Sequence, residues 1–243
     1  MKKKSFFVCT VCVKISFLLL LVSLFLFPRF FWKTNTQDAD LKQAIKNKES
    51  LNEYNEKGAT PLIGATSQGR IDLVEKLLDA GVNPNLPARN PDDIILEAEN
   101  TALHYAVLNG HYNIAKLLLD RGASVFLINK NNNTPLHTLI NAVDVPLETK
   151  SQFIDLMIQK SNNALARLFN AQNKQSYTPL MRAVELKDEN LVQLLLKKAK
   201  KHINFALRNN DGDTARELGL KKGADDTTVE LLKKAEERVT QRK

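Results

Sequence analysis

The feature that most restricts the fold of this chain is a short phrase that begins with threonine and recurs at intervals. The copies read Thr60-Pro61-Leu62-Ile63, Thr101-Ala102-Leu103-His104, Thr134-Pro135-Leu136-His137 and Thr178-Pro179-Leu180-Met181, and Asp213-Thr214-Ala215 opens a weaker fifth copy. From Thr101 to Thr134 is 33 residues. A sequence that repeats itself at this period predicts a stack of similar units, each of which contacts mainly its neighbours.

Residues 100–129 show what one unit contains. Two short helices are predicted, the first capped by Thr101, whose hydroxyl can accept an unpaired amide proton at the helix start. Gly110 permits the turn into the second helix, and Gly122 ends it. Each helix carries one apolar stripe at three-and-four spacing: Leu103, Ala106 and Val107 in the first, and Ile114, Leu117, Leu118 and Leu119 in the second. Since a lone pair of helices cannot bury both stripes, neighbouring copies must cover them.

Over about residues 38–240 the chain resembles the ankyrin-repeat family. The resemblance rests on these phrases, on their period and on the proline that follows three of the threonines. The resemblance implies an all-α fold, an ankyrin-repeat solenoid of stacked helix-turn-helix repeats joined by β-hairpin or loop fingers. It divides the chain into an N-terminal segment (1–33), a linker (34–39) and a repeat domain (40–240). Within that domain we expect a cap (40–57), repeats at about 58–97, 98–130, 131–174 and 175–210, and a C-terminal cap repeat (211–240) with helices at 215–222 and 228–237.

Two intervals are longer than the family's period. Thr60 and Thr101 are 41 residues apart, which predicts a long finger within residues 86–99. Thr134 and Thr178 are 44 residues apart, which places extra residues at 142–150 and again after Ile158. We expect residues 164–169 to extend the helix that precedes them.

The chain opens with three lysines and then an apolar run from Phe6 to Phe27 whose only charge is Lys14. This pattern is typical of a signal for export or membrane insertion. A cleaved signal peptide and an uncleaved anchor both remain possible. We favour a single-pass membrane anchor at about residues 6–27, because no small-x-small cleavage pattern follows the run and it is long enough to span a bilayer. The alternative is a secreted or exported protein. The basic residues mildly favour an N-terminus in the cytoplasm.

Charge argues against a nucleic-acid partner. The net charge is +8, but six of the 35 basic residues and none of the 27 acidic ones lie in the first 37 residues, which leaves 29 against 27. A nearly neutral domain lacks the basic footprint of a nucleic-acid binder. The cluster Lys197, Lys198, Lys200 and Lys201 is interpreted as a solvated helix end. Both cysteines, Cys9 and Cys12, lie in the N-terminal run, where no second ligand pair supports a metal or redox site.

No pattern of catalytic residues is found. By the resemblance, His104, His111 and His137 occupy structural positions, where the imidazole joins adjacent repeats or turns. Seven of the nine glycines lie at repeat turns, so none is free to build a phosphate-binding loop. We therefore expect no enzymatic activity, no cofactor, no metal and no small-molecule substrate.

What remains is recognition of a protein partner. In the family that this chain resembles, partners lie against the fingers and the exposed face of the first helices. Counting from each capping threonine gives one set of candidates: Tyr105, Leu108, Asn109, Tyr177, Arg182, Glu185 and Leu186. Aromatic, arginine and exposed apolar side chains supply many binding hot spots; the alternative is that these residues are merely packed. Ile94 and Ile95, in the long finger, are a second set.

Three functions are consistent with these observations. The first is a membrane-tethered, non-enzymatic scaffold or adaptor that binds a protein. The second is an exported, signal-cleaved protein that acts on a partner outside the cytoplasm or in another cell. The third is a regulatory or substrate-presenting subunit of an enzyme assembly, with the chemistry supplied by a partner.

Overall fold

The computed structural model describes residues 51–55, 58–89 and 99–241. Contacts between α-carbons separate residues 1–43 from residues 44–243, and all the described residues belong to the second unit. The described residues form helices; the β-structure among them is one isolated antiparallel bridge between Pro87 and Thr101. The predicted anchor at 6–27, the start of the predicted cap, and Ile94 and Ile95 lie outside the described residues. Within the described ranges, no helix combines the length and the apolar character needed to cross a bilayer.

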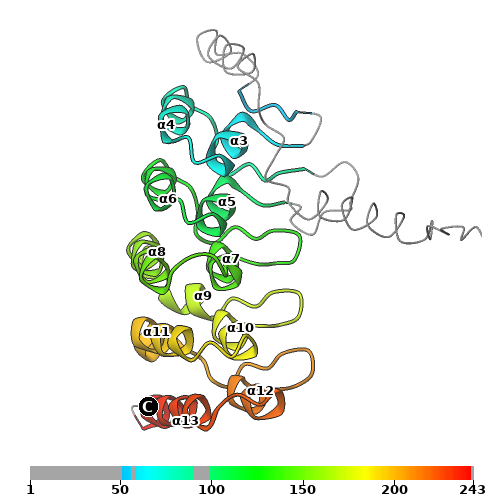
Figure 1. Cartoon of the computed structure of the whole chain (residues 1–243), viewed down its shortest axis with the longest axis vertical. Helices are drawn as coiled ribbons and strands as arrows, with labels where there is room; N and C mark the ends of the chain where they lie inside the picture. Colours follow the sequence, from blue (N-terminus) through cyan, green and yellow to red (C-terminus); the bar gives the residue numbers. More distant parts are fainter. Residues whose placement is uncertain (1–50, 56–57, 90–98, 242–243) are drawn as a thin grey trace, which may run out of the picture. The chain divides into compact units, whose positions relative to one another are not determined.

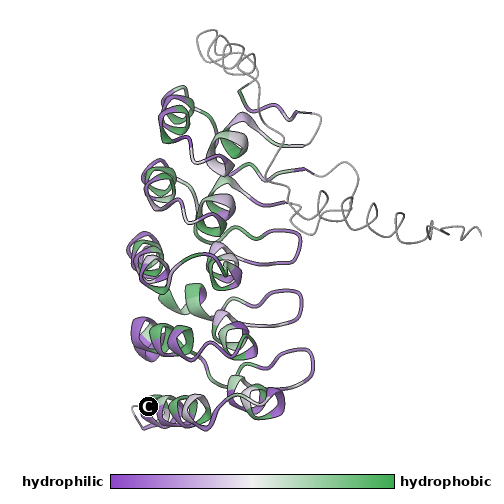
Figure 2. Ribbon diagram, viewed as in Figure 1, coloured by the Kyte–Doolittle hydropathy of each residue, from purple (hydrophilic) through white to green (hydrophobic). Residues whose placement is uncertain are grey.

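The helices come in consecutive pairs (Figure 1). The pairs are α3 (Pro61–Ser67) with α4 (Ile71–Asp79), α5 (Ala102–Leu108) with α6 (Tyr112–Asp120), α7 (Pro135–Asn141) with α8 (Leu147–Lys160), α10 (Pro179–Glu185) with α11 (Glu189–Ala199), and α12 (Ala215–Lys222) with α13 (Asp226–Thr240). Helix α9 (Leu165–Asn170) and a 3-10 helix, η1 (Lys200–His202), stand outside this pattern. The first helix of each pair packs on the first helix of the next, and the second helices do the same, so the helices form two layers. The loops between pairs, here called fingers, are mainly hydrophilic (Figure 2).

Threonine caps fix where the first helices begin. The hydroxyls of Thr60, Thr134, Thr178 and Thr214 each accept a hydrogen bond from the backbone N–H three residues ahead, at 3.2–3.5 Å. Thr101 caps α5 together with His104, whose Nδ1 lies 2.9 Å from the Thr101 hydroxyl. The repeated threonine therefore marks each start because it satisfies amide donors that a helix leaves unpaired.

The apolar stripes form the core between the layers. Leu103, Ala106 and Val107 of α5 are buried against Ile114, Leu118 and Leu119 of α6. Leu117, which the sequence pattern placed in the same stripe, is only half-buried. Ile114 and Leu118 are four residues apart and share one face, whereas Leu117 lies at the edge of that face.

The third repeat departs from the prediction. Residues 164–169 do not extend the preceding helix, because α8 ends at Lys160 and α9 is a separate helix. Between them Asn162 and Asn163 have φ of 50° and 66°, a left-handed conformation that asparagine adopts more readily than most residues. The apolar α9 buries Phe169 and packs against α10 and η1. The extra residues near 142–150 form the turn before α8 and lengthen that helix to 14 residues.

At the C-terminal end, α12 matches the expected bounds and α13 is longer than expected. Asp225 caps α13 by accepting a hydrogen bond from the Thr228 N–H at 2.8 Å, so the helix begins at Asp226 rather than Thr228.

Candidate protein-binding surface

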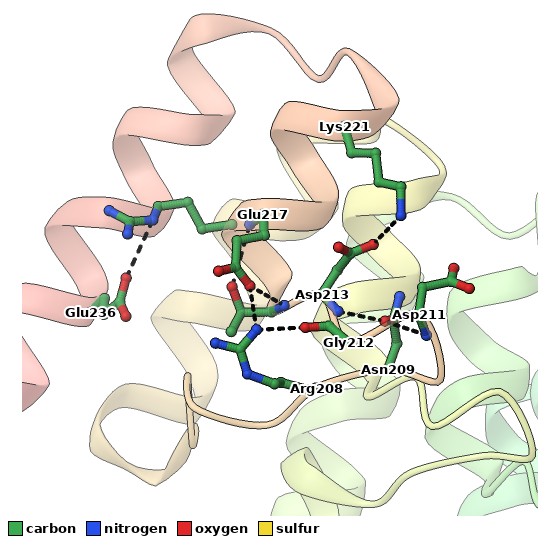
Figure 3. A network of polar contacts seen from close by, with 10 residues as sticks. Arg208, Asn209, Asp211, Gly212, Asp213, Glu217, Lys221 and Glu236 are labelled. Atoms are coloured by element: carbon green, nitrogen blue, oxygen red, sulfur yellow. Dashed lines mark hydrogen bonds and ion pairs between the residues drawn. The ribbon is translucent and has the colours of Figure 1, made fainter.

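An asparagine closes the fingers before α7, α10 and α12, five residues before the capping threonine of each helix. The Oδ1 atom of Asn129 accepts from the N–H groups of residues 131 and 133 at 3.0 Å, and Asn173 accepts from residues 175 and 177 at the same distance. Asn209 repeats the arrangement with the N–H groups of residues 211 and 213, as Figure 3 shows. This asparagine was not predicted as a structural residue, although its spacing from Thr134, Thr178 and Thr214 is visible in the printed sequence.

The same asparagines connect neighbouring fingers through their amide nitrogens. Asn129 Nδ2 donates to Asn100 Oδ1 at 2.9 Å, and Asn173 Nδ2 donates to Asn133 Oδ1 at 3.0 Å. In both cases the acceptor is the residue directly before a capping threonine. Each of these side-chain pairs is here called a rung. One joins the finger before α7 to the finger before α5, and the other joins the finger before α10 to the finger before α7. The contact between two neighbouring fingers is here called a junction.

Two histidines form a second kind of rung. His104 Nε2 lies 3.0 Å from the carbonyl oxygen of Asn133, and His137 Nε2 lies 2.9 Å from that of Tyr177. Burial lowers the pKa of each imidazole from 6.5 to about 4, so both rings are neutral at pH 7. The Nδ1 atoms accept from the backbone N–H of Thr101 and Thr134, which leaves Nε2 as the protonated donor to each carbonyl. The structural role expected for these two histidines is confirmed.

Both rungs are absent between the fingers before α10 and α12, as the asparagine and histidine are also absent around Thr60, where Ala59 and Ile63 stand. Tyr177 stands directly before Thr178, where Asn100 and Asn133 provide the acceptor in the preceding fingers, and Met181 stands in the histidine position. The buried Asn209 Nδ2 therefore lacks the asparagine acceptor and makes no hydrogen bond of normal geometry among the described residues. Its side chain instead interacts with the Tyr177 hydroxyl. This junction therefore lacks two of the hydrogen bonds that join the neighbouring fingers before it, and each such bond contributes about 1 kcal/mol to stability.

In place of the rungs, a charged cluster is built on α10. The Tyr177 hydroxyl donates to Glu185 Oε1 at 3.2 Å, and Arg182 Nη1 forms an ion pair with Glu185 Oε2. Arg182 Nε donates to Asn141 Oδ1, on α7, at 2.6 Å. Burial of Tyr177, together with the neighbouring Glu185 charge, raises the pKa of its hydroxyl, which therefore remains a donor at neutral pH. Each polar group of this cluster is thus held in one orientation.

The candidate residues differ in how far they reach solvent. The Arg182 and Glu185 side chains are 34% and 23% exposed, and Leu186 beside them is 39% exposed. Tyr177 is only 8% exposed, so its contribution is to position Glu185 rather than to present an aromatic ring. Tyr105 and Leu108 are half-buried on α5 and Asn109 is exposed; α7 lies between that helix and the cluster.

This arrangement is suited to recognition. A guanidinium and a carboxylate that are already oriented, next to an exposed leucine, can bind a complementary surface with little loss of side-chain entropy.

Among the residues described, no group of three or more His, Cys, Asp or Glu side chains is placed to hold a metal ion.

Comparisons with known proteins agree with the repeats. A model described as "Ankyrin repeat" matches residues 57–89, and one described as "Ankyrin repeats (many copies)" matches residues 88–139. The chain is 27% identical over 193 residues to "Probable 26S proteasome regulatory subunit p28" of Saccharomyces cerevisiae, which covers 78% of this chain and 77% of that protein. It is 27% identical over 175 residues to "Ankyrin repeat-containing protein P1E11.10" of Schizosaccharomyces pombe, covering 60% of this chain and 81% of that protein.

A further similarity covers much less. The chain is 38% identical to human "Ankyrin repeat and KH domain-containing protein 1" over 78 residues, which are 32% of this chain and 3% of that protein. Together with the helix pairs, threonine caps and finger rungs, these similarities confirm the resemblance predicted from the repeated phrases: the chain carries ankyrin repeats.

Proposed function

We propose that this chain is a non-enzymatic protein-interaction module that binds its partner on the surface formed by α5, α7 and α10, centred on Arg182. The observation that carries the proposal is the departure at Tyr177. There Tyr177 and Met181 replace the asparagine and histidine that form the rungs of the two preceding junctions, while an oriented ion pair forms between Arg182 and Glu185. A local rule that is broken at a cost in stability points to selection for function.

The chemistry of the surface indicates the kind of partner. Arg182 and Glu185 offer one charge of each sign, and Leu186 and Leu108 offer apolar area. We expect a folded protein surface that pairs a carboxylate with Arg182 and covers the leucines, since arginine at the centre of a desolvated patch is a frequent hot spot.

We expect Arg182→Ala to weaken partner binding by at least about tenfold, because it removes one guanidinium and also releases Glu185 and Tyr177 from their orientation. The test expresses the tagged unchanged chain and each tagged variant in cells of the source organism. The proteins that co-purify with each chain are quantified by mass spectrometry. The matched control is Arg216→Ala, which removes an exposed arginine of α12 that pairs only loosely with Glu236 at 3.6 Å. Equal recovery of the same partner with both variants would place the binding surface elsewhere.

We also propose that residues 6–27 tether the module to a membrane, as a single-pass anchor. The proposal is supported by the apolar run and by the basic residues before it. A C-terminally tagged full-length chain is expected at full mass in the membrane pellet, and protease added from one side then identifies the compartment of the repeats. A shortened, soluble band would instead support the exported, signal-cleaved alternative.

A second candidate function is a regulatory or substrate-presenting subunit of an enzyme assembly. It is favoured by the similarity to a protein named as a probable regulatory subunit of the 26S proteasome. In that case an activity co-purifies with the chain and is lost in Tyr105→Ala/Leu108→Ala, while the purified chain alone turns over no substrate. Intrinsic turnover by the purified chain would contradict both candidate functions.

A further inference from the structure

The layer of second helices contains a groove between α11 and α13, and Leu147 of α8 also lines it. Its volume is about 760 Å³. We propose that this groove, here called the basic groove, binds an acidic amphipathic helix of a partner protein. The proposal is independent of the surface around Arg182, which lies on the layer of first helices.

The floor of the basic groove is apolar. Leu231, Ala235 and Val239 follow one another at four-residue spacing and form one row along α13, and all three are half-buried. Leu194 faces them from α11 and is also half-buried, while Leu147 is 41% exposed. Because these side chains line an open groove and keep part of their surface exposed, a further helix can cover them.

The rim of the groove carries positive charge. Five cationic side chains line it and no carboxylate does. Lys234 lies 3.4 Å from Glu230, whereas Lys197, Lys200, Lys201 and Arg238 form no ion pair with any described residue. Lys198, between them in sequence, turns away from the groove and pairs with Asp155 of α8. The lysine run was interpreted from sequence as a solvated helix end. Lys197, Lys200 and Lys201 are indeed exposed, and they also face a common groove, whereas Lys198 is paired.

An acidic amphipathic helix fits this combination. Its apolar stripe can cover the row on α13, and carboxylates flanking that stripe can reach Lys197 and Lys201 on one wall and Arg238 on the other. The 15 residues of α13 are about 22 Å long, which is room for about four turns of a partner helix. A flat lipid surface can reach the rim and the exposed Leu147, but it covers the half-buried Leu194 and Leu231 less well than an inserted helix does. The lining residues include no aromatic side chain on which a nucleic-acid base could stack.

The probe for the test is a stapled two-heptad peptide with leucine on one face and glutamate on both flanks. Its binding to the full chain, kept in a nonionic detergent, is followed by fluorescence anisotropy. We expect binding at low salt that is lost at about 1 M salt, where the Debye length falls to about 3 Å. Lys197→Glu/Lys201→Glu should weaken it at least about tenfold, because two attractive pairs become repulsive. The charge-matched control, Lys76→Glu/Lys222→Glu, changes two exposed lysines of α4 and α12 and should bind as the unchanged chain does.

Further arms distinguish this proposal from its alternatives. Arg182→Ala should bind the peptide normally even if it loses its own partner, so the two proposals can fail separately. A peptide with lysine in place of glutamate should not bind. Equal binding by the two charge-reversed chains would overturn the proposal. It would also be overturned if the peptide failed to bind while vesicles containing phosphatidylserine bound through the same lysines. Failure of the peptide to bind, together with self-association of the chain that depends on the groove lysines and is measured by light scattering, would likewise overturn the proposal.

Discussion

Replacing Leu118 by alanine is expected to lower the free energy of unfolding by about 2–5 kcal/mol, the range for removing a large buried aliphatic side chain. Leu118 lies on the core face of α6 and is 0% exposed. Truncation leaves a cavity between the two layers that the surrounding helices can fill only in part. Since whole domains are stable by about 5–15 kcal/mol, this one change removes a large share of the total.

Leu117→Ala is the matched control, because it removes the same atoms one residue earlier in the same helix. Leu117 is half-buried, so we expect a loss of less than half that of Leu118→Ala. Both variants are compared by urea unfolding, together with hydrogen exchange of the α6 amides, since repeats can open locally. Equal losses for the two leucines would show that α6 is rotated relative to the core face assigned to it.

The parts of the fold that could be predicted from sequence are those governed by local physics. A threonine cap and an apolar stripe act within one or two turns, so Thr134 and Thr178 marked helix starts correctly. The prediction that residues 164–169 extend the preceding helix was wrong, because the structure of this segment depends on the residues before it and on packing against another helix. Asn162 and Asn163 end the preceding helix by adopting positive φ, and Phe169 is buried where α9 packs against α10 and η1, which lie outside the segment itself. Periodicity within the segment carries neither piece of information.

The candidate site was predictable in position but not in arrangement. Arg182 and Glu185 follow from counting forward from Thr178, and the structure places them together on α10. The hydrogen bond from Arg182 to Asn141 joins residues in different repeats, and the burial of Tyr177 depends on the packing of two fingers. Such long-range contacts are set by the stacking of repeats. The functions of Tyr105, Leu108, Asn109 and Leu186 remain predictions.

The two buried histidines make the stability of the stack depend on pH. Burial lowers the pKa of His104 and of His137 to about 4, against 6.5 in the unfolded chain. Between these values the unfolded chain binds protons that the folded chain excludes, so the free energy of unfolding falls as the pH falls. Protonation of Nδ1 would also place a donor against the N–H of Thr101 or Thr134, where each ring now accepts a hydrogen bond.

We expect acidification from pH 7.5 to pH 5 to cost about 2 kcal/mol for each histidine, and roughly 3 kcal/mol each by pH 4, where the loss levels off. The measurement is urea unfolding of the full chain at a series of pH values. His104→Gln/His137→Gln should be less stable at pH 7.5 but should lose most of this slope, whereas His202→Gln, in η1, should keep it. Asp120, held by Lys116 and Lys160 with a pKa lowered to about 2, loses its contribution only below about pH 4 and so lies outside this window. A slope that persists unchanged in the double glutamine variant would mean that the proton uptake occurs elsewhere, and that the two rungs are not what makes this stack sensitive to acid.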